Sequence, residues 1–153
     1  PSAAPGGAKG FGVRGGAQVL ALAAARRRTR PGGQPTADGC AVKTGGGARR
    51  AGIEAIAWAR EAAERGVGGI LLSSIDADGT KAGFDLVITR RISESVGVPV
   101  VASGGAGTLE HMAAVLLEGK ADAVLAASIF HFGTYTVGDV KQFLARQNIP
   151  VRL

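Results

Sequence analysis

Polar residues and glycines follow three short apolar runs of this chain, at the point where each run ends. The three groups are Ser73, Ser74, Asp76, Asp78, Gly79 and Thr80; Ser103, Gly104 and Gly105; and Ala127 and Ser128. If the runs are strands of one parallel sheet, these groups share the edge at which active sites of such sheets form. Glycine turns at helix starts present backbone N–H groups to an anion. The pattern predicts a phosphate site, although glycines can also serve turn geometry alone.

The clearest of these turns lies between residues 98 and 118. Val98, Val100 and Val101 are β-branched, which predicts a buried strand that ends at Ser103. Thr108 stands where a helix N-cap is expected, so residues 109–118 are predicted to be helical. This stretch therefore predicts a strand, a glycine turn and a helix in immediate succession.

Further elements follow from the spacing of apolar residues. Strands are expected at residues 69–75 and 121–127, and helices at 53–66, 84–96, 128–132 and 136–147. Alternation of strands and helices with short connections predicts parallel strands and right-handed crossovers. The strand starts are roughly 29 and 23 residues apart, near the length of one unit in a (β/α)8 barrel of ~250 residues.

The chain is long enough for about half of such a barrel. Its 153 residues hold up to four βα units, so the expected fold class is α/β, a (β/α)8 TIM barrel present as about half a barrel. A half-barrel has two open sheet edges, which associate readily. We therefore expect a complementary half-barrel, a homodimer, or a longer chain of which this is a portion.

The first third of the chain is less regular. Residues 18–25 form an apolar run that is compatible with a strand or a helix, and its position and length favour a strand. Residues 1–17 and 29–52 are rich in glycine and predict loose segments and a long loop. Two regions are therefore expected: 1–51, with one strand and a long loop, and 52–153, with the phosphate-binding turns.

The net charge of +6 is concentrated in residues 1–50. Arg26, Arg27, Arg28 and Arg30 could suggest a nucleic-acid-binding protein. No interleaved aromatic residues or recognition motif accompany them, which favours a solvated basic loop. Nucleic-acid binding is kept as a remote alternative.

Several classes of protein are disfavoured by composition. Cys40 is the single cysteine, which excludes an internal disulfide and favours a reducing, cytoplasmic location. No apolar run reaches the ~18–20 residues of a membrane span, and no signal peptide is recognisable. His111 lies beside Glu110 without the spacing of a metal-binding motif, so no metal site is expected.

Three segments resemble the cyclase subunit of imidazole glycerol phosphate synthase. They are residues 71–85, 102–111 and 126–132, and the closing residues 149–153 resemble the end of the same family. A related phosphoribosyl isomerase barrel shares the phosphate turns. The runs Ser74-Ile-Asp-Ala-Asp-Gly-Thr80 and Ser128-Ile-Phe-His-Phe132 favour the cyclase.

The resemblance implies a lyase of histidine biosynthesis built as a (β/α)8 barrel. Such an enzyme combines ammonia with a phosphoribulosyl aminoimidazole carboxamide nucleotide. Its products are imidazole glycerol phosphate and aminoimidazole carboxamide ribotide. The ammonia comes from a glutaminase subunit docked on the opposite face of the barrel, and no metal or other cofactor is required.

The resemblance also assigns roles to individual residues. Asp78, Gly79, Gly104, Gly105, Ala127 and Ser128 match positions that hold one substrate phosphate. Ser73 and Ser103 match polar positions near the reacting centre. These eight residues are the candidate site of this chain.

Both catalytic aspartates of that family are missing here. One belongs to a first strand that this chain lacks, and the other to a fifth strand, expected at residues 19–25. Ala23, Ala24 and Ala25 stand where the family has Ile-Asp-Ala, and Ala77 stands where it commonly has arginine. No catalytic residue is therefore assigned, and a non-catalytic phosphate-binding half-barrel remains an alternative.

Overall fold

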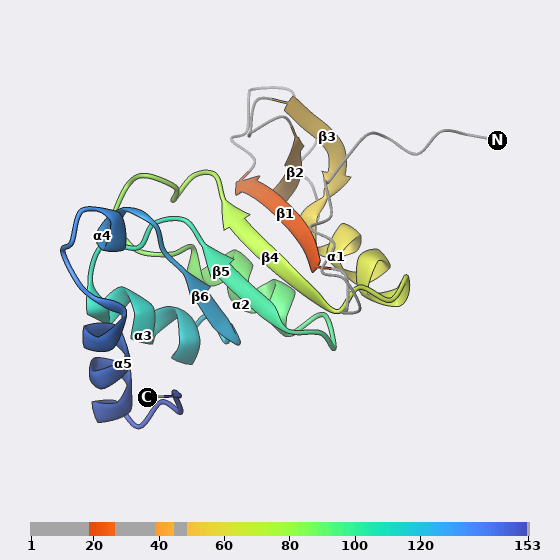
Figure 1. Cartoon of the computed structure of the whole chain (residues 1–153). Helices are drawn as coiled ribbons and strands as arrows, with labels where there is room; N and C mark the ends of the chain where they lie inside the picture. The colour runs from red at the N-terminus through yellow and green to blue at the C-terminus, as the bar shows by residue number, and fades with distance from the viewer. Residues whose placement is uncertain (1–18, 27–38, 45–48, 153) are drawn as a thin grey trace.

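The computed structural model describes residues 19–26, 39–44 and 49–152. They form a six-stranded sheet in the order β3-β2-β1-β4-β5-β6, with helices packed against it (Figure 1). The strands are β1 (Val19–Arg26), β2 (Cys40–Thr44), β3 (Arg49–Glu54), β4 (Gly69–Ser74), β5 (Val100–Ser103) and β6 (Ala123–Leu125). The helices are α1 (Ala55–Glu64), α2 (Leu86–Ser93), α3 (Leu109–Leu117), α4 (Ser128–His131) and α5 (Val137–Arg146).

Strands β1, β4, β5 and β6 run parallel to one another. Ser73 of β4 pairs with Ala23 of β1 on one side and with Ser103 of β5 on the other, and Ser103 pairs with Leu125 of β6. This register places the carboxyl ends of all four strands at one edge. The predicted α/β architecture with parallel strands is confirmed for this part of the sheet.

Strands β2 and β3 show that one prediction was wrong. Residues 29–52 were expected to form a loop, but β2 lies within that range, and β3 begins in it and extends to Glu54. Strand β2 pairs antiparallel with the last residues of β1, from Ala23 to Arg26, and β3 pairs antiparallel with β2. The glycine-rich sequence hides these short strands, because pairing with β1 and burial of Cys40, Ala41 and Val42 stabilise β2. The sheet is therefore mixed and not wholly parallel.

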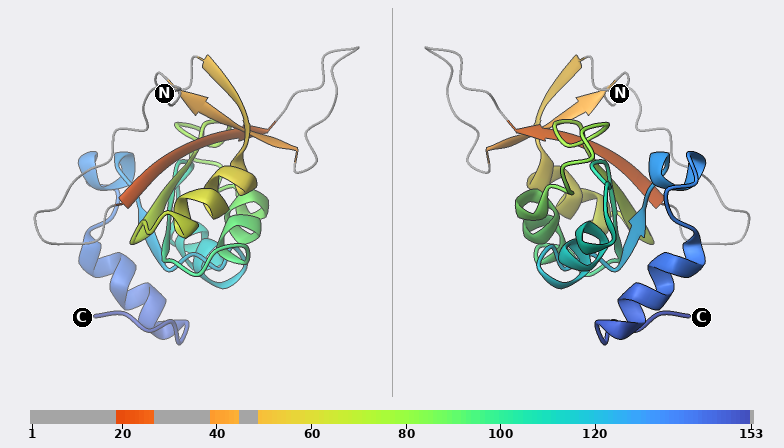
Figure 2. Two further views of the ribbon diagram at one scale, coloured as in Figure 1. Left: turned by 90° about the vertical axis from the view of Figure 1, so that its right-hand side faces the viewer. Right: turned by 90° about the vertical axis from the view of Figure 1, so that its left-hand side faces the viewer.

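The helices α1, α2 and α3 lie on one face of the sheet (Figure 2). Alternate side chains of the strands are buried on that face, since successive residues of a strand point to opposite sides. One core cluster joins β1, β2, β4 and the start of β5 to α1 and α2, and a second joins the end of β5 to α3, α4 and α5. Ala55, Ala59 and Ala62 of α1 are buried and small, which lets this helix lie close to the strands.

Polar caps define where the helices begin. The Thr108 hydroxyl accepts the His111 N–H at 3.4 Å, and the Thr136 hydroxyl accepts the Asp139 N–H at 3.1 Å. Asp139 in turn accepts the Thr136 N–H, and this hydrogen bond holds the pKa of the Asp139 carboxyl below its ordinary value. Both starts agree with the sequence prediction. Helix α2 begins two residues later than expected, because Asp85 caps it.

The sheet does not close into a barrel over the described residues. Strand β6 pairs with β5 on one side, and no described strand pairs with its other side. Leu125 of β6 is 42% exposed. No helix in the described part of the chain combines the length and apolar character that a membrane span requires.

The core assignment leads to a stability prediction with a matched control. Leu72 of β4 is 1% exposed, whereas Leu117 at the end of α3 is 59% exposed. Leu72→Ala should lower the free energy of unfolding by about 2–5 kcal/mol, because it removes buried methylene groups and leaves a cavity. Leu117→Ala should change it by less than about 1 kcal/mol. Urea unfolding followed by circular dichroism measures both, and equal losses would contradict the assigned core.

Candidate functional site

A cavity of about 130 Å³ lies at the carboxyl edge of the parallel strands. Its walls come from the loops after β4, β5 and β6. The lining residues are Asp78, Gly79, Lys81, Ser103, Gly104, Gly105, Ala106, Leu125, Ala126, Ala127 and Ser128. All six predicted phosphate ligands and Ser103 thus line one cavity. Ser73 does not line it, although it pairs with Ser103 in the sheet.

The loop after β4 is shaped by hydrogen bonds within itself. The Asp78 N–H donates to the Ser74 carbonyl at 2.9 Å, and the Thr80 N–H and hydroxyl both donate to the Ala77 carbonyl. Gly79 has a φ of +74° and open space where a Cβ would stand. These bonds fold residues 74–80 into a compact turn whose exposed Asp78 and Gly79 border the cavity.

The loop after β5 contains two glycines in the left-handed region, Gly104 with φ +92° and Gly105 with φ +100°. A Cβ at Gly104 would lie 2.9 Å from the Ser74 carbonyl oxygen, and one at Gly105 would lie 2.1 Å from the Gly83 carbonyl oxygen. The Gly83 N–H also donates to the Gly105 carbonyl at 2.8 Å. These glycines are therefore required by the close approach of two loops, a reason that the sequence did not supply.

Lys81 is a lining residue that the sequence analysis missed. Its ammonium group lies 5.6 Å from the centroid of the Phe132 ring, at the end of α4. Such a cation–π contact connects the loop after β4 with α4. Its place two residues after Gly79 could have indicated that Lys81 belongs to the site. Its contact with Phe132 could not be predicted, because that contact depends on the tertiary fold. Lys81 gives this cavity a positively charged wall residue.

The third wall comes from the start of α4. The Phe130 and His131 N–H groups donate to the Ala127 carbonyl, at 3.2 and 2.9 Å. These bonds begin a single helical turn at Ser128, where the sequence predicts a short helix. Ala127 is exposed and Ser128 half-buried, so both are accessible from the cavity.

No carboxylate reaches this edge from β1. Ala23 and Ala24 of β1 pair with Ser73 and Ser74 of β4. Ala24 is 1% exposed and belongs to the core cluster beneath the sheet, and its carbonyl accepts the Ile75 N–H at 2.9 Å. Strand β1 therefore offers no general acid or base to the cavity.

The His111 side chain forms hydrogen bonds with the backbone just before its own helix. Its Nδ1 accepts the N–H groups of Gly107 and Thr108, each at 3.2 Å. The neighbouring Glu110 is exposed, and hydrogen bonds from its own N–H and from the Thr108 hydroxyl lower the pKa of its carboxyl. Among the described residues, no three His, Cys, Asp or Glu side chains are grouped as a metal site requires.

Residues 13–136 match the model of a protein family described as histidine biosynthesis protein. The chain belongs to this family. The match extends from before β1 to the residue that caps α5, and so includes all three loops around the cavity. It also begins inside residues 1–51, the part of this histidine biosynthesis protein in which the sequence showed least resemblance. Family membership assigns the chain to histidine biosynthesis without separating a cyclase from an isomerase.

The contact between the two loops can be tested with two alanine substitutions. Gly79→Ala meets no atom and should destabilise the protein by only about 1–2 kcal/mol, the strain of a positive φ. Gly105→Ala adds a collision with the Gly83 carbonyl and should cost roughly 2–6 kcal/mol in strain and overpacking. Thermal or urea unfolding compares them, and a Gly105→Ala protein as stable as Gly79→Ala would refute the contact.

Proposed function

We propose that this chain is a cyclase-type component of histidine biosynthesis that binds one phosphate of a phosphoribulosyl aminoimidazole carboxamide nucleotide. The observation that carries the proposal is the convergence of two glycine turns and Ser128 on one small cavity. The runs 74–80 and 128–132 favour the cyclase over the related isomerase. In the reaction of that family, this substrate and ammonia yield imidazole glycerol phosphate and aminoimidazole carboxamide ribotide.

The chemistry of the cavity suits a phosphoryl group. Gly79 and Gly105 carry no side chain, so an anion can approach their backbone N–H groups closely. Lys81 supplies a positive charge, and Ser128 supplies a hydroxyl donor. Hydrogen bonds to a charged group are worth about 1.5–3 kcal/mol each, so a few such donors suffice for specific binding.

Asp78 needs a different role from that of the glycines. Its N–H is already donated to the Ser74 carbonyl, and its carboxylate would repel a phosphate dianion. We assign the Asp78 carboxylate to a hydroxyl or amine donor of the substrate next to the phosphate. Lys81, in the same wall, would offset the repulsion.

Catalysis as in the cyclase family requires two aspartates, and this chain has Ala23, Ala24 and Ala25 where the resemblance places one of them. Cyclisation with ammonia needs proton transfers, and alanine cannot accept or donate a proton. We therefore propose that the chain contributes substrate binding, and that the acid–base groups come from a second polypeptide or from another portion of the same protein. A non-catalytic phosphate-binding half-barrel is the alternative.

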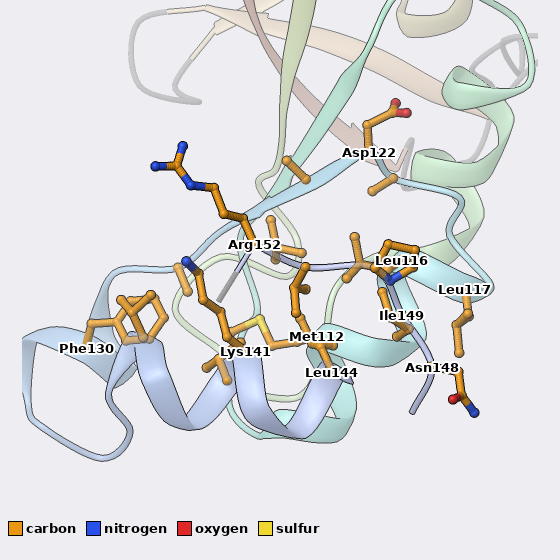
Figure 3. Close-up of a pocket in the computed structure, with 18 residues that line it drawn as sticks. Met112, Leu116, Leu117, Asp122, Phe130, Lys141, Leu144, Asn148, Ile149 and Arg152 are labelled. Carbon is orange, nitrogen blue, oxygen red and sulfur yellow. The ribbon is translucent and has the colours of Figure 1, made fainter. Parts of the chain in front are cut away.

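The open side of β6 is the place where a complementary half-barrel would join. An apolar groove of about 710 Å³ lies beside this strand, between α3, α5 and residues 148–152 (Figure 3). Met112 and Leu144 lie at its centre, while Lys141 and Arg152 lie toward one side. A strand–helix unit could pair its strand with β6 and bury apolar residues of its helix in the groove.

A second copy of this chain could cover the same edge and form a homodimer. It would bring another β1 with Ala23, Ala24 and Ala25, and therefore no new carboxylate. For an active enzyme we favour a complementary half that carries the aspartates. A glutaminase subunit, as in the cyclase family, would then supply ammonia to the completed barrel.

Removing one hydroxyl tests the phosphate site. Ser128→Ala should weaken binding of inorganic phosphate or a sugar phosphate by about 1.5–3 kcal/mol, because a charge-assisted hydrogen bond is lost. Thr134→Ala, in the exposed loop after α4, is the matched control and should bind as the parent does. Isothermal titration calorimetry measures both, and a parent protein that binds no phosphate would refute the proposed function.

The absence of the two aspartates of the cyclase family predicts a kinetic result. The purified chain supplied with the aminoimidazole substrate and ammonia should show no turnover above the uncatalysed rate. Sedimentation of the chain mixed with the first half of a cyclase barrel should show a heterodimer, because that half covers the β6 edge. Turnover by the chain alone would show that residues other than the family aspartates perform the proton transfers.

A further inference from the structure

His111 occupies the third position of α3 and contacts the loop before it. The Nδ1 atom accepts two N–H groups, those of Gly107 and Thr108, each at 3.2 Å. In return the His111 N–H donates to the Thr108 hydroxyl at 3.4 Å. Reciprocal bonds of this kind are usually made by glutamate or glutamine at the third helical position. Here an imidazole makes them and accepts one additional N–H.

The same ring also contacts the loop after β4. The position of a Cβ on Gly83 would lie 3.4 Å from His111 Cδ2 and 3.5 Å from Nε2, so the ring lies against the Gly83 backbone. The Gly83 N–H donates to the Gly105 carbonyl at 2.8 Å. His111 thus contacts Gly83 on one side and Gly107 on the other. Gly105 lies between these contacts, because its carbonyl accepts the Gly83 N–H and it precedes Gly107 by two residues.

We propose that His111 is a positioning residue of the phosphate site. It does not line the cavity, so it acts through the loop that contains Gly104 and Gly105. This inference rests on the proposed phosphate binding. Its physical basis is the Nδ1 acceptor: without it, the part-buried N–H groups of Gly107 and Thr108 lose this hydrogen-bond partner and turn toward water or another carbonyl. That rotation would redirect the preceding peptides, whose N–H groups are the proposed donors to the anion.

A ring that accepts hydrogen bonds differs from a ring that only packs, and substitutions separate the two. His111→Phe keeps an aromatic ring beside Gly83 but has no acceptor. His111→Gln has an acceptor for the Thr108 N–H but no ring. Glu110→Gln, on the neighbouring exposed position, is the control, because the glutamine oxygen can still accept the hydrogen bond of the Thr108 hydroxyl.

The experiment is a titration of each protein with inorganic phosphate, followed by backbone amide NMR. We expect His111→Phe to weaken phosphate binding about tenfold, and His111→Gln and Glu110→Gln to stay within about threefold of the parent. In the absence of phosphate, the Gly104 and Gly105 amide signals should move in His111→Phe and stay near their parent positions in His111→Gln. Circular dichroism checks folding, and His111→Ala is the second acceptor-free variant if His111→Phe does not fold.

Two results would overturn the inference. One is an acceptor-free variant that is folded and binds phosphate as the parent does. The other is a His111→Gln protein as impaired as His111→Phe, which would mean that ring packing alone matters. If the parent itself binds no phosphate, the proposed function fails. The amide signals of Gly104 and Gly105 then still decide whether the Nδ1 acceptor orients this loop.

Discussion

The loops after β4 and β5 approach each other so closely that position 105 admits only glycine. A Cβ at Gly105 would lie 2.1 Å from the Gly83 carbonyl oxygen, and the Gly83 N–H donates to the Gly105 carbonyl. This contact keeps the two turns in one arrangement, with Asp78 and Gly79 on one side of a small cavity. Because the loops contact each other directly, the backbone N–H groups around the cavity are held in place without a ligand, and such preorganisation would reduce the entropy lost if the proposed anion binds.

The parallel register of the strands makes that contact possible. Ser73 and Ser103 pair directly, so β4 and β5 end side by side and their loops start at the same level. Strand β6 extends the register to Leu125, which brings α4 to the third wall. On β1 the same edge carries alanines, and β2 pairs with the last residues of this strand. The proposed phosphate site is thus formed by three strand ends, and the fourth strand end carries alanines and no carboxylate.

Much of this arrangement could be predicted from local sequence. Short apolar runs that end in polar residues or glycines predicted β4, β5 and β6, and Thr108 and Thr136 predicted two helix starts. Strands β2 and β3 were missed, because their stability comes from pairing with β1 and not from their own propensity. The roles of Lys81 and His111 were also missed, since both depend on contacts with another loop. Local patterns indicate where polar groups gather, and tertiary contacts decide which of them cooperate.

The proposed function depends on one anion site at the carboxyl edge of the parallel strands. Backbone amide NMR during titration with inorganic phosphate tests it most directly, because it locates the anion residue by residue. The amide signals of Gly79, Gly104, Gly105 and Ser128 should shift together and saturate at one dissociation constant. Shifts that cluster instead among the arginines of residues 26–30, with the four site amides unmoved, would contradict it.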